Sequence, residues 1–149
     1  QIDVFVGEFS MCHALPIADR LDCPGPALPA TDLVMTKLQI VELNAKDRSD
    51  LFALLAGCAV RDGDDGAIEP GRVAELTARD WGLHHTFELN LAKLRAAIDA
   101  GEGPAAACGA IDALAAAMDA APKSRGWKMR ARIGERKRWY ELPEEVDRA

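Results

Sequence analysis

An alanine-rich run from Ala105 to Ala121 is the feature that most limits what this chain can fold into. Alanine has the highest helix propensity of all residues, so the run predicts a helix that packs closely through small side chains. The composition agrees, because 49% of the residues are hydrophobic while only 5% are aromatic. Asp112 and Asp119 interrupt the run, and no window approaches the about 18 unbroken apolar residues of a membrane helix. We therefore expect a globular, mostly helical protein with no membrane partner.

The N-terminal residues predict strands. Ile2 to Val6 is β-branched and aromatic and carries one charged residue, Asp3, and His13 to Arg20 is expected to hold a second short strand. Because the chain begins with Gln1 and enters the strand at once, we expect a truncated chain whose sheet begins upstream. The expected fold class is α+β and mostly helical, with one or two N-terminal strands followed by about five or six helices.

Capping residues and helix breakers mark the helix boundaries that we expect. Thr31 is a candidate N-cap for a helix to about Leu43, and Asn44 is a candidate N-cap for the next. The further expectations are a helix over Ala45–Ala56 stopped by Gly57, a helix from Pro70 to Arg79, a break at Trp81-Gly82, helices over His84–Ala100 and Ala105–Ala121, and a basic helix opened by Pro122-Lys123-Ser124.

Lys37 stands at the centre of an apolar helical stripe. Its neighbours three and four positions away are Leu33, Val34, Ile40 and Val41, all of them apolar. A lysine in such a stripe either extends past its neighbours to reach solvent or projects into a polar pocket. Because an ammonium group is a common partner for phosphates, the second reading predicts a phosphate-binding pocket.

Three carboxylates could serve a site together with Lys37. Asp3 lies within a strand, where a charged side chain either faces solvent or is paired or bound to a metal. Asp47 and Asp50 open the helix that follows Asn44, where Asp47 suits the helix dipole and Asp50 can pair with Lys46 one turn away. Helix stabilisation explains Asp47 and Asp50 as well as catalysis does.

The charge of the chain is divided unevenly. The segment from Lys123 to Arg138 holds eight basic residues and one acid, which is a net charge of +7. Since the whole chain has a net charge of −6, the residues outside this segment have a net charge of −13. Such a segment is either a solvated face or a surface for phosphates. Trp127, Trp139 and Tyr140 lie within it or beside it, and we expect them to anchor the last helix. Candidates for contact with nucleic acid are Arg125, Lys128, Arg132 and Arg136.

The cysteines and histidines indicate no metal site. The four cysteines form no CxxC pair, and the three histidines complete no zinc spacing. Scattered single cysteines are typical of a reducing compartment, so we expect a cytoplasmic protein. His84 and His85 are adjacent, point in different directions and receive no role.

The residues from Leu28 to Leu43 (LPATDLVMTKLQIVEL), followed by Asn44 to Leu51 (NAKDRSDL), resemble bacterial nucleotidyltransferases of the abortive-infection toxin type. These proteins belong to the polymerase-β-like nucleotidyltransferase superfamily. The resemblance extends over Ile2 to about Ala56, and the stretch from Ala121 to Pro143 looks like a tail in relatives. It implies that residues 1–57 are the C-terminal part of a catalytic core, and that residues 58–149 form a helical region packed with it.

The resemblance also implies roles for individual residues. Asp3 would match the third metal-binding carboxylate, Lys37 the lysine that faces the triphosphate, with Lys46 nearby, and Asp47 the acid of the next motif, with Asp50 beside it. In such sites two Mg²⁺ ions held by carboxylates activate the attacking hydroxyl and neutralise the leaving pyrophosphate. The glycine turn and the Asp-x-Asp pair that precede the third carboxylate in the family do not stand before Asp3 here. These 149 residues alone are therefore not expected to catalyse nucleotide transfer.

Three functions remain open from the sequence. The first is metal-dependent transfer of a nucleotide from a nucleoside triphosphate to a hydroxyl of RNA, protein or a small molecule. The second is a non-catalytic helical domain that binds a partner such as an antitoxin protein. The third is a nucleic-acid-binding module whose affinity falls steeply with salt, because binding through the basic segment releases counterions.

Overall fold

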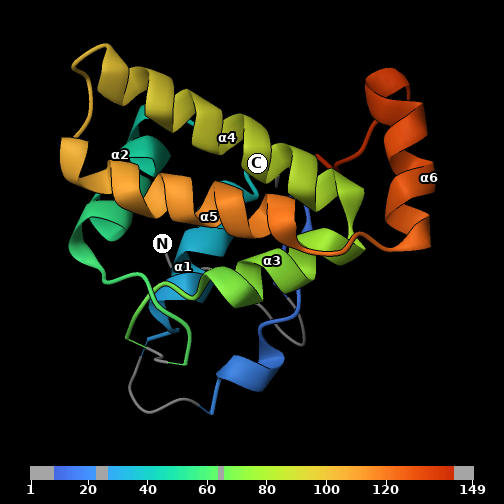
Figure 1. Ribbon diagram of the computed structural model, residues 1–149, viewed down its shortest axis with the longest axis horizontal. Coiled ribbons are helices and arrows are strands. Elements are labelled where there is room, and N and C mark those ends of the chain that lie inside the picture. The colour runs from blue at the N-terminus through green and yellow to red at the C-terminus, as the bar shows by residue number, and fades with distance from the viewer. Residues whose placement is uncertain (1–8, 23–26, 64–65, 143–149) are drawn as a thin grey trace, which may run out of the picture.

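A short β-hairpin and six α-helices make up the described part of the structure, a computed structural model that describes residues 9–22, 27–63 and 66–142 (Figure 1). This architecture confirms the predicted mostly helical α+β class. The strand predicted over Ile2–Val6, and Asp3 with it, lies outside the described residues. In chain order the elements are β1 (Phe9–Ser10), β2 (Ala14–Leu15), the 3-10 turn η1 (Ala18–Arg20), α1 (Ala30–Leu38), α2 (Ala45–Gly57), α3 (Pro70–Arg79), α4 (Trp81–Asp99), the 3-10 turn η2 (Ala105–Ala107), α5 (Cys108–Ala120), α6 (Arg125–Ile133) and the 3-10 turn η3 (Gly134–Arg136).

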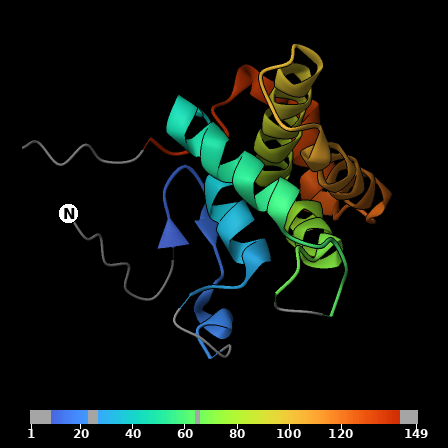
Figure 2. The ribbon, with the colours of Figure 1, turned by 90° about the vertical axis from the view of Figure 1, so that its left-hand side faces the viewer.

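One hydrophobic core joins the hairpin to α1, α2, α3, α4 and α5. The two strands pair antiparallel, with Phe9 opposite Leu15, and Leu15 enters the core. α1 packs against α2, while α3 and α4 both pack against α5 (Figures 1 and 2). Leu51 comes from residues 1–57 and Phe87 from residues 58–149, the two regions that the sequence analysis distinguished, and both side chains belong to this same core.

The first turn of α1 is tied to the segment before α3. Thr31 is not the N-cap that we expected, because Pro29 occupies that position and Thr31 lies inside the helix. Its buried hydroxyl donates to the carbonyl of Ala67 at 3.1 Å and accepts from the backbone N–H of Glu69 at 2.8 Å. The hydroxyl therefore satisfies a long-range pair of backbone groups rather than the start of its own helix.

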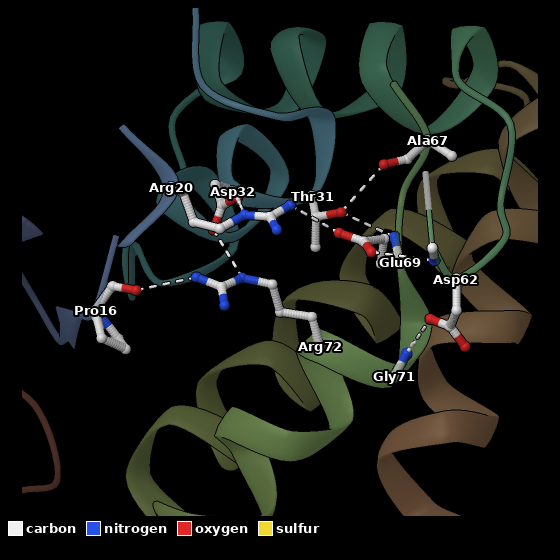
Figure 3. Close-up of polar contacts among 10 residues, drawn as sticks. Pro16, Arg20, Thr31, Asp32, Asp62, Ala67, Glu69, Gly71 and Arg72 are labelled. Atoms are coloured by element: carbon white, nitrogen blue, oxygen red, sulfur yellow. Dashed lines mark hydrogen bonds and ion pairs between the residues drawn. The ribbon is translucent and has the colours of Figure 1, made fainter. Parts of the chain in front are cut away.

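Asp32 binds two arginines in the protein interior (Figure 3). Its side chain is 0% exposed; Arg20 Nε donates to Oδ2 at 3.0 Å, and Arg72 Nε donates to Oδ1 at 3.0 Å. Arg20 also pairs with Glu69 at 2.8 Å, and Arg72 donates to the carbonyl of Pro16 at 3.0 Å. This cluster holds η1, α1 and α3 together, because each carboxylate oxygen of Asp32 receives one guanidinium.

α1 ends at Leu38 rather than at about Leu43 as we expected. The side-chain amide of Asn90 in α4 donates to the carbonyl of Leu38 at 2.9 Å and to that of Ile40 at 2.7 Å. These carbonyls would otherwise lack partners at a buried helix end. A side chain 50 or more positions away therefore decides where α1 stops.

Local capping chemistry set the next boundaries as predicted. The side chain of Asn44 accepts from the backbone N–H of Asp47 at 2.9 Å, which confirms Asn44 as the N-cap of α2. Pro70 opens α3 in its first turn, and the helix ends at Arg79. The predicted break at Trp81-Gly82 is wrong, because α4 begins at Trp81.

Asp80 both ends α3 and begins α4. Its carboxylate accepts from the backbone N–H of Gly82 at 2.7 Å and from that of Leu83 at 3.2 Å. Gly82 is needed for close packing, since a Cβ added there would lie 2.6 Å from the carbonyl oxygen of Trp139. Gly82 resembled a helix breaker in the sequence, but its lack of a side chain allows the backbone of Trp139 to pack directly against α4.

α6 is attached through aromatic contacts, as we expected for the tryptophans. Trp127 meets the ring of His84 edge-on, with the ring centroids 5.2 Å apart, and Trp139 packs against Trp81 and His85. The guanidinium of Arg130 lies 4.6 Å from the centroid of the Trp81 ring. No residue of α6 is buried, so the helix sits on the surface of the core rather than within it.

His84 makes the stability of the protein depend on pH. Burial lowers the pKa of His84 from its ordinary value of 6.5, and Lys123 adds to this effect, while Glu88 and Asp119 oppose it. The unfolded chain therefore binds more protons near pH 6 than the folded chain does. The contribution of neutral His84 to the free energy of unfolding is fully present above about pH 6.5 and decreases as the pH falls.

We expect the free energy of unfolding to fall between about pH 7 and pH 5.5, and to fall less steeply in His84→Leu. Nδ1 of His84 is buried and has no hydrogen-bond partner within the described residues, so leucine removes the titration without removing a hydrogen bond at that atom, although it also removes the ring contact with Trp127. Urea denaturation at several pH values measures both slopes. Equal slopes in the two proteins would show that His84 does not carry the effect.

No single helix among the described residues is long and apolar enough to cross a membrane. The segments Ala105–Ala120 and Arg125–Arg136 meet that criterion only when they are taken together, and they are bent by 106° relative to each other.

Candidate functional site

Lys37 joins α1 to α2 through two carboxylates. It lies in the last turn of α1, and its Nζ is 2.8 Å from Oδ1 of Asp47 and 3.0 Å from Oδ2 of Asp50. The side chain is 27% exposed, so it extends past its apolar neighbours to the surface at the start of α2. The lysine that the apolar stripe singled out and the two acids of the following helix therefore meet in space.

The start of α2 sets the positions of the acids. Asn44 caps the helix and fixes the backbone of Asp47, whose side chain is 12% exposed. Asp50 follows almost one turn later and also pairs with Lys46 at 3.3 Å, which confirms the predicted pair between these two residues. Because Lys46 is 79% exposed, that pair contributes little to stability.

The cluster keeps Lys37 and Asp50 charged. Burial by itself lowers the pKa of the Lys37 ammonium, but the hydrogen bonds and charges of Asp47 and Asp50 outweigh it, so the pKa lies above its ordinary value. Hydrogen bonds from Lys37 and then Lys46 lower the pKa of Asp50. The result is a cation and an anion that both persist over the physiological pH range.

Two buried amides that the sequence analysis missed hold the backbone beside Lys37. Gln39 Oε1 accepts from the backbone N–H of His13 at 2.9 Å, which connects the turn of the hairpin to the end of α1. Asn90 closes the same helix end from α4. The only signal in the sequence is a polar residue among apolar ones, which does not reveal its partner.

The other predicted site residues lie elsewhere. Asp3 is outside the described residues. The four basic candidates for nucleic-acid contact lie on α6 and η3. α6 packs against α3 and α4, whereas Lys37 connects α1 with α2. Arg125, Lys128, Arg132 and Arg136 are all exposed.

No three side chains of the usual metal-ligand types converge in the described part of the chain. Mg²⁺ is usually held by one or two carboxylates together with water and substrate phosphates. The carboxylates of Asp47 and Asp50 are engaged by lysine. The sequence does contain one Asp-x-Asp triplet, Asp62-Gly63-Asp64, but Asp62 accepts from the backbone N–H of Gly71 and Asp64 is not described.

A polar cleft of about 520 Å³ lies where the hairpin turn meets the C-terminal segment. His13, Trp139 and Tyr140 line it, together with three basic residues and two acids. His13 Nε2 is 2.8 Å from the hydroxyl of Thr86, which also accepts from the indole N–H of Trp139. Burial lowers the pKa of His13, while Asp80 and Glu141 oppose the shift, so the ring serves as a neutral structural group at physiological pH.

Comparison of the chain with protein-family models, with curated proteins and with solved structures finds no match.

Proposed function

We propose that this chain is part of a metal-dependent nucleotidyltransferase that transfers a nucleotide from a nucleoside triphosphate to a hydroxyl of RNA, protein or a small molecule. The observation that carries the proposal is the meeting of Lys37 with Asp47 and Asp50 at the junction of α1 and α2. The resemblance of residues 28–51 to toxin-type nucleotidyltransferases links these residue types to a triphosphate site.

In this proposal Lys37 contacts the phosphates. A lysine ammonium has three N–H donors, and Asp47 and Asp50 accept two of them, which leaves one for a phosphate oxygen. The two acids hold the flexible side chain in place, so that less rotamer entropy is lost when the nucleotide binds. Lys46, which pairs with Asp50 at the surface, adds positive charge to the approach of the triphosphate.

The remaining roles follow from the resemblance. Asp3 would be a catalytic and metal-binding carboxylate, and Asp47 and Asp50 would act beside it. Mg²⁺ in the full protein would supply charge neutralisation for the triphosphate. Since no three candidate ligands converge among the described residues, we assign no reaction step to the metal through them.

Replacing Lys37 by methionine is expected to weaken the binding of nucleoside triphosphates about 10- to 100-fold, which corresponds to the loss of one hydrogen bond to a charged group. Isothermal titration of the chain with each common triphosphate measures the affinity. Lys46→Met is the matched comparison, and we expect a smaller loss because that ammonium is 79% exposed. Unchanged affinity in Lys37→Met would remove Lys37 from the site.

Denaturation of both variants shows whether the fold is intact. A decisive assay of the activity uses the full-length encoded protein with Mg²⁺, labelled triphosphates and candidate acceptors. If no label is incorporated into any acceptor and the wild-type chain binds no triphosphate, the transferase proposal fails.

The alternative is a non-catalytic helical domain that binds a protein partner of the antitoxin kind. In that case the contact of Lys37 with Asp47 and Asp50 only ties α1 to α2. The wild-type chain would then show no affinity for triphosphates, while Lys37→Met would still lower the stability, because it leaves the two acids without their shared cation.

A further inference from the structure

The outward face of α6 is basic and apolar. Five residues of α6 that are three or four positions apart share one face. Arg136 of η3 lies beside them, because its guanidinium donates to the carbonyls of Arg132 and Ile133, and all six residues are exposed. Met129 is 68% exposed and Ile133 is 44% exposed. The opposite face carries Trp127 and Arg130, which seat the helix on α4. We call this outward face the basic ridge; it consists of Arg125, Lys128, Met129, Arg132, Ile133 and Arg136.

The charges of the basic ridge are not neutralised within the described part of the chain. No described carboxylate pairs with Arg125, Lys128 or Arg132, and Arg136 donates only to the backbone carbonyls of Arg132 and Ile133. By contrast, Arg72 and Arg95 on other helices each pair with an acid at 3.0 Å or less. Unpaired cations next to exposed apolar side chains favour a partner that is both acidic and apolar.

A groove between α4 and α5 has the complementary character. It has a volume of about 270 Å³, and Leu91, Ile111 and Met118 form its apolar floor. Four charged residues also line the groove: Glu88, Asp119, Asp112 and Arg95. Arg95 and Asp112 form an ion pair with 2.6 Å between Nη1 and Oδ1, so their charges cancel. Among the described residues Asp119 has no ion pair, and Glu88 has only a contact of 3.4 Å with His85. The groove therefore offers two carboxylates to a cationic partner.

The basic ridge cannot fill the groove of its own chain. α6 stands at one end of the α4–α5 pair and runs across it (Figure 1), and its inward face is the one that contacts α4. Met129 and Ile133 lie on the opposite side of the helix and face away from that contact. Ridge and groove can meet only if they come from different molecules.

We infer that the basic ridge of one copy docks into the α4–α5 groove of a second copy. The dimensions agree, because Ile111 to Met118 spans about 10 Å of helix while Met129 and Ile133 lie about 6 Å apart along theirs. The two apolar side chains pack on the groove floor, and the neighbouring arginines reach Glu88 and Asp119. In a two-fold dimer each copy contributes one ridge and one groove, so both complementary pairs form.

Charge reversal on each surface tests the inference. The ridge variant is Arg125→Glu with Arg132→Glu, and the groove variant is Glu88→Lys with Asp119→Lys. We expect the wild-type chain to dimerise with rising concentration in sedimentation equilibrium, and to do so less at about 1 M salt than at about 0.1 M. Each variant alone is expected to dimerise at least about tenfold more weakly, because ridge and groove then carry like charges.

Mixing the two variants provides the decisive result. The acidic ridge of one variant then meets the basic groove of the other, and the remaining wild-type ridge and groove also match, so a heterodimer is expected to form. The matched control is Glu42→Lys with Glu75→Lys, which changes the net charge by the same amount as the groove variant. These two exposed acids lie outside α4, α5 and α6, so the control should dimerise like the wild type.

Two outcomes would overturn the inference. One is a wild-type chain that remains monomeric up to about 1 mM, where an association with a free energy near −4 kcal/mol would be visible. The other is a failure of the mixed variants to associate although each is folded by circular dichroism. If the wild-type chain is monomeric and binds single-stranded RNA in fluorescence anisotropy, and only the ridge variant loses this binding, the basic ridge serves nucleic acid instead.

Discussion

Asp32→Asn is expected to lower the free energy of unfolding by about 3–5 kcal/mol, the usual cost of removing one partner from a buried ion pair. Asp32 is 0% exposed and binds Arg20 and Arg72, one through each carboxylate oxygen. Asparagine keeps one acceptor oxygen but places an NH₂ group against the other guanidinium, so two donors face each other. The cluster then keeps both guanidinium groups but has lost the carboxylate that they share.

Urea denaturation of the purified variant measures this loss. Glu75→Gln is the matched control, because it removes one carboxylate charge from an exposed pair with Arg79 and should cost less than about 1 kcal/mol. Similar losses in the two variants would mean that water or a shift of the arginines relieves the charge in Asp32→Asn. The cluster would then not be the main tie between η1, α1 and α3.

Asn90→Leu is expected to lower the free energy of unfolding by about 3 kcal/mol. Leucine has the same number of side-chain heavy atoms and the same branching but no donor, so the carbonyls of Leu38 and Ile40 lose their bonds of 2.9 Å and 2.7 Å. Each buried carbonyl left without a partner costs about 1–3 kcal/mol. The end of α1 then loosens one residue after Lys37, so triphosphate affinity should fall as well if Lys37 binds the nucleotide.

Thermal or urea denaturation measures the stability change, and the titration used for Lys37→Met measures the affinity. Lys93→Met is the control, since it removes only the 3.4 Å contact between its ammonium and the side-chain oxygen of Asn90. A loss below about 1 kcal/mol in Asn90→Leu would indicate that water replaces the amide. If Asn90→Leu is less stable but binds triphosphates with unchanged affinity, the order at the end of α1 does not contribute to nucleotide binding.

The helix starts that the sequence predicted correctly are those with a local cause. Asn44 caps α2 through a bond to Asp47 three residues later, and Pro70 opens α3 because its ring is compatible with the first turn of a helix. Both causes act over a few residues, so the sequence pattern contains them completely. The predicted anchoring of the C-terminal helix by Trp127 and Trp139 also held, because large aromatic side chains are rarely left in solvent.

The boundaries that were wrong depend on residues far away in the chain. Thr31 resembles an N-cap, but its hydroxyl serves Ala67 and Glu69. Gly82 resembles a helix breaker, but it lies under the backbone of Trp139. In both cases a tertiary contact competes with the local preference of the residue, and a local pattern does not show which of the two prevails.

The candidate site divides in the same way. The sequence by itself placed Leu33 and Val34 one turn before Lys37 and placed Asp47 and Asp50 in the next helix, because helical periodicity and capping depend on near neighbours. The half of the stripe expected from Ile40 and Val41 was wrong, because α1 ends at Leu38. Only the tertiary structure decided that Lys37 pairs with both acids, that Asn90 closes its helix, and that two arginines meet on Asp32. The physical reason is that burial makes a polar group find a partner, while the packing of the helices decides which one is within reach.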